Sequence, residues 1–344
     1  MRFRDQDIVF AGGSKGQNFD IPSANPVNYF HVVSKPADLP RLTIDGKLFL
    51  PSASRRKASE KFPLVMVVPG SLGVAPSHLA HAEALVDDGF AAFVLDSFGA
   101  RDVTSTVANQ TQFSFASSAY DVLAAWKVLA SHPQIDALRI GAQGHSRGGS
   151  AVLTAATRRF ADAVLGEGVG FKSILAAYPW SGHQFLEPDV GNTEIRIVMG
   201  DADEWCSPMQ VQGHCQAIRL TGGKVAMRLI SGAQHSFDRG TDIVNVPDAS
   251  VSPGAPTVYL DNNGAFIHPL GDVADSKLGD RDLMIYEGRL RPQGRQDRKP
   301  RRRERTVQGG HAGILAADAG RSVATIVLNF TTHMLGYWIA RFRG

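Results

Sequence analysis

Residues 140–151 read Ile-Gly-Ala-Gln-Gly-His-Ser-Arg-Gly-Gly-Ser-Ala, and this stretch decides the fold. The segment 135–141 suits a buried strand, and residues 150–160, which are rich in Ala, Leu and Arg, suit a helix. The Gly-x-Ser-x-Gly pattern around Ser146 is that of a nucleophile elbow, in which a strained turn lifts a serine hydroxyl clear of a sheet. The sequence therefore predicts Ser146 as a nucleophile, and the alternative is an ordinary serine in a glycine-rich loop.

The composition is that of a globular protein. The chain has 344 residues, of which 43% are hydrophobic and 20% charged, and its net charge of +3 gives no argument for nucleic acid as a partner. No apolar run approaches the roughly 18 residues that would span a bilayer. Residues 1–10 contain no hydrophobic signal region, which predicts a cytoplasmic protein, with a secreted mature form as the alternative. The oligomeric state stays open, and a homodimer is one option.

The sequence gives no sign of a metal or a cofactor. Its two cysteines, Cys206 and Cys215, are too few for a disulfide scaffold or a four-ligand zinc site. We expect free buried thiols, and a bond between the two is the alternative. The first strand is followed by neither a Gly-x-Gly-x-x-Gly turn nor a Walker lysine, which excludes a standard nucleotide site. We therefore expect no cofactor and no metal.

Apolar runs and helix-like segments alternate along most of the chain. This alternation predicts an α/β fold with a mostly parallel, doubly wound sheet flanked by helices. Residues 1–40 suggest an edge strand with extended packing, and 41–51 suggest a hairpin at Asp45-Gly46 or a strand entering the sheet. The expected strands are 62–68, 91–95, 135–141, 172–178, 194–199 and 224–230, and the expected helices are 77–88, 115–131, 150–160 and 208–220.

We expect one α/β domain over residues 1–344. It would comprise N-terminal strands and an extension (1–60), a catalytic core (61–238), a long loop-rich insertion (239–320) and a C-terminal helix (321–341). The insertion carries a basic cluster, which would suit a lid or a contact with an anionic surface. A solvated excursion is the favoured alternative. The cluster comprises Arg289, Arg291, Arg295, Arg298, Lys299, Arg301, Arg302, Arg303 and Arg305.

Acidic and basic side chains follow the later strands. Asp203 comes after the strand at 194–199, and His235 comes after the strand at 224–230. Ligands of such sheets bind outside the carboxyl ends of the strands. The order Ser146, Asp203, His235 is the order of nucleophile, acid and base in α/β-hydrolases.

Three pieces of sequence resemble the dienelactone hydrolase family of the α/β-hydrolase superfamily. They are Gly144-His145-Ser146-Arg147-Gly148-Gly149, Gly200-x-x-Asp203 with a Trp and a Pro soon after, and Ala233-Gln234-His235-Ser236-Phe237-Asp238. The resemblance covers about residues 62–238 and implies Ser146 as nucleophile, Asp203 as acid and His235 as base. One departure is clear: the dienelactone hydrolases proper use cysteine as the nucleophile, so this chain is more similar to their serine carboxylesterase relatives.

Other residues could take two of these roles. Asp201 and Glu204 are rival acids, although the family spacing Gly-x-x-Asp favours Asp203. His311, within Gly309-Gly310-His311, is the rival base. His235 would take the proton of the attacking serine and return it to the leaving alkoxide, while the acid orients the imidazole.

The oxyanion of the reaction needs two preorganised donors. One should be the backbone N–H of Arg147, the residue after the nucleophile. The other should come from the loop 69–73, with Ser71 preferred and Leu72 as the alternative. An ordinary tight turn would require the same glycines.

Three residues are candidates for substrate binding. Arg101 resembles a family arginine that can hold a substrate carboxylate, and a structural salt bridge is the equal alternative. Trp180 and Trp205 follow strand ends, so either could wall an acyl or alcohol pocket or simply pack a loop onto the core.

Taken together, these residues predict a metal-independent serine hydrolase. It would cleave a small-molecule carboxylic ester or lactone through an acyl-enzyme. A peptidase or acyltransferase that uses the same three residues is the alternative among enzymes. A catalytically silent binding scaffold is the alternative outside them.

Overall fold

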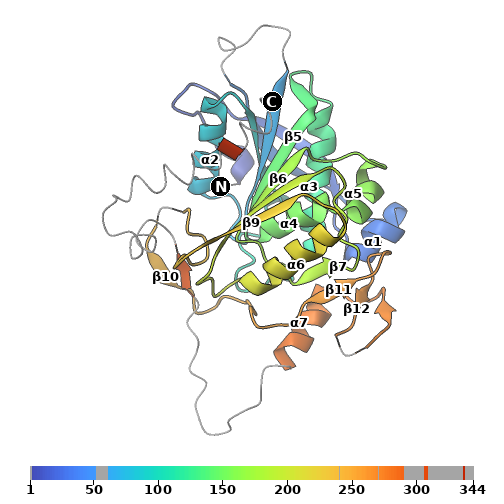
Figure 1. Cartoon of the computed structure of the whole chain (residues 1–344). Coiled ribbons are helices and arrows are strands. Elements are labelled where there is room, and N and C mark those ends of the chain that lie inside the picture. The colour runs from blue at the N-terminus through green and yellow to red at the C-terminus, as the bar shows by residue number, and fades with distance from the viewer. Residues whose placement is uncertain are drawn as a thin grey trace.

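A computed structural model of the chain describes residues 2–51, 61–239, 241–269, 271–289, 306–308 and 336–337. Its central sheet has eight strands in the order β1-β2-β4-β3-β5-β6-β8-β9 (Figure 1). Neighbouring strands from β4 to β9 run parallel, whereas β2 is antiparallel to both of its neighbours, β1 and β4. The strands are β1 (Gln17–Ala24), β2 (Arg41–Phe49), β3 (Phe62–Val68), β4 (Ala91–Asp96), β5 (Ile135–His145), β6 (Ser173–Ala177), β8 (Glu194–Gly200) and β9 (Val225–Ile230). The predicted α/β architecture with a mostly parallel sheet is therefore confirmed.

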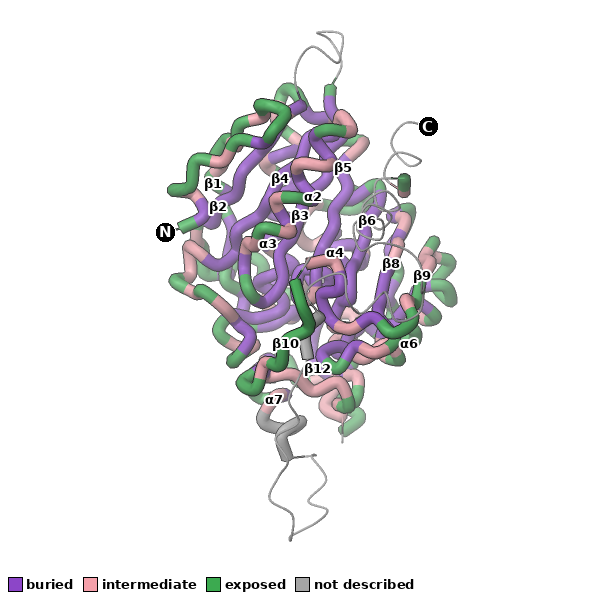
Figure 2. Tube along the Cα trace, turned by 90° about the vertical axis from the view of Figure 1, so that its left-hand side faces the viewer, coloured by how far each residue is buried: buried purple, intermediate pink, exposed green. Residues whose placement is uncertain are grey.

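Helices cover both faces of this sheet. On one face, α2 packs in a cluster with Val65 and Val67 of β3. On the other, α3 and α4 pack with Leu64 and Met66 of the same strand. A central strand covered in this way must be apolar throughout, which is why β3 reads as a continuous hydrophobic run and is buried along its length (Figure 2). The helices are α1 (Tyr29–Ser34), α2 (Pro76–Asp87), α3 (Phe115–Ala130), α4 (Arg147–Ala156), α5 (Arg158–Leu165) and α6 (Pro208–Leu220), with short 3₁₀ turns at Phe3–Asp5, Pro36–Asp38 and Gly99–Arg101.

The N-terminal region agrees with the prediction in its strands and differs from it in one helix. The edge strand is β1, at residues 17–24, and part of the apolar material expected to be extended forms the short helix α1. Of the two alternatives for residues 41–51, the strand entering the sheet is confirmed and the hairpin does not form, because β2 continues straight through Asp45-Gly46 and pairs Gly46 with Leu95. A Cβ on Gly46 would lie 2.4 Å from the ring of Phe93. The glycine is needed for this close packing and not for a turn.

The segments around the elbow also have different ends from those predicted. The strand β5 reaches His145, and Leu138 is an exposed residue of it, with 84% of its surface accessible. The helix expected over 150–160 is two helices, because Thr157 adopts an extended conformation that ends α4 and precedes α5. Because α4 begins at Arg147, the helix follows directly after Ser146.

The described part of the insertion forms short strands and one helix. Its elements are β10 (Ile243–Asn245), β11 (Val258–Leu260), β12 (Phe266–Ile267), β13 (Ala274–Asp275), α7 (Asp280–Arg289) and β14 (Thr306–Gln308). The strand β11 runs parallel to β7 (His183–Phe185), which ties the insertion to the loop after β6. The side chain of Arg289, the rest of the basic cluster (291–305), His311 and all but two residues of the predicted helix at 321–341 lie outside the described residues.

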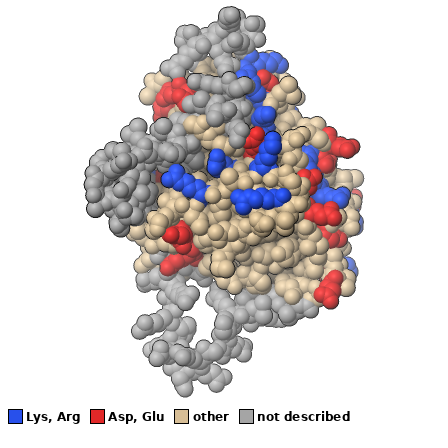
Figure 3. Space-filling view, viewed as in Figure 1, with Lys and Arg blue, Asp and Glu red and all other residues tan. Residues whose placement is uncertain are grey.

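None of the helices in the described ranges is long and apolar enough to cross a bilayer. On the face seen in Figure 3, basic and acidic side chains are interspersed, and several Lys and Arg side chains lie across its middle.

Candidate active site

Ser146 occupies the turn between β5 and α4. Its backbone has φ 54° and ψ −118°, a conformation that non-glycine residues rarely adopt. The turn is held by a hydrogen bond of 3.0 Å from the Ser146 N–H to the carbonyl of Ala177 on the neighbouring strand. The strand-turn-helix arrangement of a nucleophile elbow is therefore present.

Three glycines make room for this turn. A Cβ on Gly144 would lie 2.1 Å from the carbonyl oxygen of Gly148, and one on Gly148 would lie 2.2 Å from that of Val68. A Cβ on Gly70, in the loop after β3, would lie 3.1 Å from the Cβ of Ser146. Side chains at the first two positions would collide with backbone, which has no room to move.

The side chains of Ser146, His235 and Asp203 form one hydrogen-bonded chain. The distance from His235 Nε2 to Ser146 Oγ is 2.9 Å, and that from His235 Nδ1 to Asp203 Oδ2 is 2.8 Å. The other carboxylate oxygen, Asp203 Oδ1, accepts hydrogen bonds from the backbone N–H groups of Trp205 (2.8 Å) and Cys206 (2.9 Å). With Nδ1–H donated to the carboxylate, Nε2 is left as an acceptor for the serine proton.

The rival acids lie elsewhere. Asp201 accepts a hydrogen bond of 2.7 Å from the backbone of Gly232 and so joins the loops after β8 and β9. Glu204 is exposed. Neither carboxylate forms a hydrogen bond or ion pair with His235.

Two aromatic rings enclose the imidazole of His235. The indole of Trp205 stacks on it, with ring centroids 5.1 Å apart and planes inclined by 9°. The ring of Tyr178 meets it edge-on at 4.9 Å. These contacts keep water away from the His235–Asp203 hydrogen bond, since both side chains are almost completely buried.

A second buried network lies beside this site, and no role was predicted for it. Asp238 accepts a hydrogen bond of 2.6 Å from the Tyr178 hydroxyl at Oδ1, while Nε2 of His81 lies 2.9 Å and Nε2 of His145 3.5 Å from Oδ2. Burial raises the pKa of the Asp238 carboxyl, but the hydrogen bond with His81 and the nearness of His145 outweigh it and hold the pKa well below its usual range. Asp238 belongs to the motif quoted above, yet only the fold shows that it meets Tyr178.

Two groups of side chains have the donor atoms of a metal site. In the part of the chain that the structure describes, they are His81, His145 and Asp238, and Asp203, Cys206 and His235. In the first group the donors also bond directly to one another through Asp238. In the second, burial raises the pKa of the Cys206 thiol well above its usual value, with Asp203 adding to the rise, which disfavours the thiolate that a metal needs. The absence of a metal stays a prediction. Cys206 and Cys215 are both free and buried.

The candidate oxyanion donors lie around Ser146. Arg147 is the first residue of α4, so its N–H has no partner one turn earlier in the helix. Its guanidinium is buried and donates to Ser118 Oγ and to the carbonyls of Gln110 and Phe113. In the loop after β3, Ser71 is buried, whereas Leu72 is 47% exposed. Two cavities border Ser146. Ser71 lines both of them, whereas Leu72 lines only one.

Arg101 does not reach the site. Its guanidinium forms a buried ion pair with Asp121 at 2.7 Å and donates to the carbonyls of Ser97 and Ala24. Arg101 borders neither of the two cavities at Ser146. The salt-bridge alternative thus describes the structure, and the expectation of a substrate carboxylate at this position is corrected.

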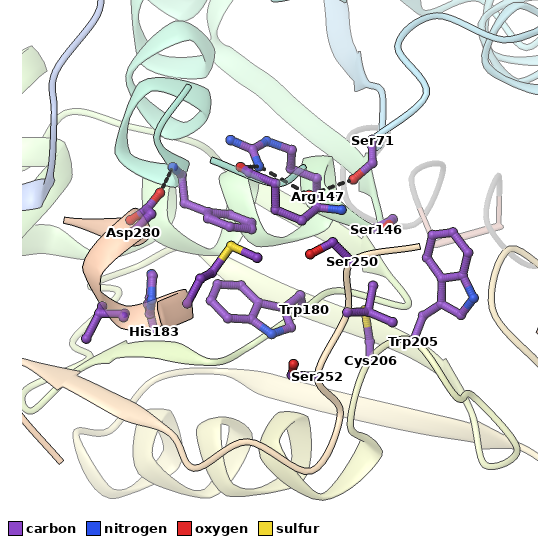
Figure 4. A pocket seen from close by; sticks show the side chains of 15 residues that line it. Ser71, Ser146, Arg147, Trp180, His183, Trp205, Cys206, Ser250, Ser252 and Asp280 are labelled. Carbon is purple, nitrogen blue, oxygen red and sulfur yellow. Dashed lines mark hydrogen bonds between the residues drawn. The ribbon is translucent and has the colours of Figure 1, made fainter. Parts of the chain in front are cut away.

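Two cavities meet at Ser146. The first, of about 640 Å³, contains Trp180 and residues of the insertion (Figure 4), and the second, of about 720 Å³, contains His235. Trp205 borders both cavities. The first is lined by Ser71, Gln110, Phe115, Ser146, Arg147, Trp180, His183, Trp205, Cys206, Ser250, Val251, Ser252, Asp280, Leu283 and Met284. The insertion therefore reaches the site, although its action as a lid stays a prediction.

Acid should destabilise the fold through four buried histidines. Burial lowers the pKa of His145 and His214 to about 4 and that of His183 to about 3, and it lowers that of His78 well below its usual value. Below pH 6.5 the unfolded chain therefore binds protons that the folded chain does not, and stability falls with pH down to about pH 4. Asp280 has the opposite effect on stability. Burial raises its pKa to about 6, so in this pH range the folded chain binds one proton on Asp280 that the unfolded chain does not.

We expect the free energy of unfolding to fall by about 3 kcal/mol or more between pH 7 and pH 5, at roughly 1.4 kcal/mol per proton and pH unit. Urea unfolding at several pH values measures it. His214→Asn removes one of the four histidines, so the free energy of unfolding should depend less steeply on pH, by the contribution of one proton. A free energy that does not change over this range would contradict the burial of these side chains as neutral groups.

Comparison with known proteins gives the following matches. A family model described as "Dienelactone hydrolase family" matches residues 48–252, more than half of the chain. The structure of a putative dienelactone hydrolase from Klebsiella pneumoniae subsp. pneumoniae is 16% identical, with 64% of this chain and 89% of that chain covered and a TM-score of 0.45. An esterase from the Planctomycetes species Thermogutta terrifontis is 17% identical, with 63% and 86% covered and a TM-score of 0.43. Among curated proteins there is no match.

Proposed function

Because the chain belongs to the dienelactone hydrolase family, we propose that it is a serine hydrolase that cleaves a carboxylic ester or lactone through an acyl-enzyme on Ser146. The observation that carries the proposal is the unbroken hydrogen-bonded chain from Ser146 Oγ through His235 to Asp203, built on a strained elbow at the end of the sheet. A serine hydroxyl needs such a base, since it is a weak nucleophile at neutral pH.

The reaction begins when Ser146 Oγ attacks the carbonyl carbon of the ester and its proton passes to His235 Nε2. The developing oxyanion accepts hydrogen bonds from the N–H of Arg147 and from that of Ser71 or Leu72, and such donors contribute on the order of 3 kcal/mol each. The protonated imidazole then gives its proton to the leaving alkoxide, and the carbon–alkoxide bond breaks. A water molecule repeats the sequence on the acyl-enzyme, which frees the acid and restores Ser146.

The two cavities suit the two halves of an ester. The leaving alkoxide must lie near Nε2 of His235, which donates its proton, and His235 borders the second cavity. The acyl group would then occupy the first cavity, between Ser146 and α7. A peptidase, an acyltransferase and a silent scaffold stay as alternatives, which hydrolysis rates for aryl esters, peptides and added alcohol acceptors would separate.

The experiment is covalent labelling with a fluorophosphonate, followed by peptide mass spectrometry. We expect one adduct, on Ser146, and none on the Ser146→Ala variant. Ser252→Ala removes a different hydroxyl from the same cavity and should leave the labelling unchanged. An adduct on another residue, or none on the folded protein, would refute the assignment.

A further inference from the structure

The first cavity has two chemically different ends. In Figure 4, Ser146 and Trp205 lie at one end, Asp280 and His183 lie at the other, and Trp180 lies between them. An acyl group that starts at Ser146 would therefore run along Trp180 toward Asp280.

The carboxylate of Asp280 is buried, and only one of its two oxygens has a hydrogen-bond partner among the described residues. Asp280 is the first residue of α7, and 5% of its surface is accessible. Its Oδ2 accepts a hydrogen bond of 2.7 Å from the backbone N–H of Phe115. Its Oδ1 accepts no hydrogen bond from any residue that the structure describes. A buried polar atom without a partner costs about 1–3 kcal/mol, so a donor supplied by a ligand would bind there favourably.

On the basis of the function proposed above, we propose that Asp280 Oδ1 binds a neutral hydroxyl group at the far end of the acyl chain of the substrate. The preferred substrates would be esters of apolar, especially aromatic, acids that end in a hydroxyl group. This assigns to Asp280 the role of a specificity-determining residue, which neither the sequence motifs nor the family match indicates.

The middle of the cavity fits an apolar chain. Phe115 and Trp180 pack against each other there, with ring centroids 4.4 Å apart, and Leu283 and Met284 of α7 face the same space. These four side chains offer aromatic and aliphatic surface but no hydrogen-bond donor except the indole N–H of Trp180. A flat apolar acyl group would pack along these four side chains, past the hydroxyl groups of Ser250 and Ser252, and would reach the carboxylate of Asp280 at its end.

The charges at this end favour a neutral donor over an ammonium group. Burial raises the pKa of Asp280 to about 6, while Arg147 lowers it, so the carboxylate is ionised at neutral pH with Arg147 as the nearby positive charge. Burial and then Arg147 lower the pKa of His183, on the same cavity, to about 3. Since Arg147 already supplies a positive charge near this end, it reduces the gain from a substrate ammonium, whereas a neutral hydroxyl carries no cost of burying a charge.

A purely structural role for Asp280 must be separated from this one. Its Oδ2 caps the first N–H group of α3, so removal of the side chain also affects stability. The variant Asp280→Asn keeps an oxygen for that N–H group but no longer offers a carboxylate to the cavity. A preference between two substrates that differ by one hydroxyl group is a readout that loss of a helix cap would not change.

The experiment compares matched pairs of para-nitrophenyl esters. The acids are benzoic, phenylacetic and phenylpropanoic acid, each with and without a para-hydroxyl group, so that three chain lengths sample the distance to Asp280. For at least one pair, we expect the hydroxylated ester to have a kcat/KM about tenfold higher in the wild type, as a hydrogen bond to a charged group would give. The ratio should fall to about one in Asp280→Asn and Asp280→Ala and persist in the control Asp272→Asn, an exposed carboxylate away from the cavity.

Each outcome has one meaning. Retained hydrolysis of the unsubstituted esters by Asp280→Asn, together with a lost hydroxyl preference, supports the subsite. A preference that persists in both Asp280 variants, a ratio of one for every pair in the wild type, or a preference for para-aminomethyl over para-hydroxyl esters overturns it and leaves the proposed function intact. Failure of the folded wild type to hydrolyse any ester overturns the proposed function and the subsite with it.

Discussion

Replacing Ser146 with alanine should lower kcat for ester hydrolysis by about 10⁴-fold or more, the scale seen when the nucleophile of a serine hydrolase is removed. The alanine has no oxygen to attack the carbonyl, so no acyl-enzyme can form and His235 has no serine proton to accept. Substrate binding should change little, because the two cavities are formed by other side chains.

Steady-state rates on para-nitrophenyl acetate measure this effect, with a burst of nitrophenol counting the active sites of the wild type and the protein concentration those of the variant. The matched control is Ser252→Ala, which removes another hydroxyl from the first cavity and should keep kcat within a few-fold. Wild-type rates in a folded Ser146→Ala protein would mean that hydrolysis takes place without this residue.

The parts of the fold that local sequence determines were predictable. The bounds of β3 follow directly from its apolar run, because a strand covered on both faces contains no polar residue to blur its ends. For Gly46 the sequence left a hairpin and a continuous strand both open, because Asp-Gly is a strong hairpin signal over short range. What decides its conformation is the ring of Phe93 on a neighbouring strand, which no local pattern reports.

The residues of the site also divide into those that the sequence could predict and those that it could not. Ser146, Asp203 and His235 follow strand ends in a known order, so the sequence alone could nominate them. The positions of Asp238, Asp280 and Arg101 depend on partners distant in the chain. Asp238 meets Tyr178 60 residues away and Asp280 meets Phe115 165 residues away. Arg101 forms an ion pair with Asp121, and a single sequence holds no signal for that pairing.

Replacing Asp203 with asparagine should lower kcat by about 10⁴-fold, a magnitude known for this change in a serine protease, even though the side chain keeps its shape. The reason lies in the two backbone N–H groups of Trp205 and Cys206 that point at Oδ1. The amide must turn its oxygen toward these donors, and its NH₂ group then faces Nδ1 of His235.

Facing an NH₂ group, Nδ1 must act as an acceptor, so the proton of the neutral imidazole moves to Nε2, where it points at Ser146 Oγ. An imidazole in that tautomer cannot take the serine proton, and attack on the ester stops at that step. Asp201→Asn and Glu204→Gln are the matched controls, because the carboxylate of Asp201 accepts a hydrogen bond from Gly232 of an adjacent loop and Glu204 is exposed. If Asp201→Asn were the variant that lost activity and Asp203→Asn kept it, the acid would be Asp201, and the hydrogen bond between Asp203 and His235 would have only a structural role.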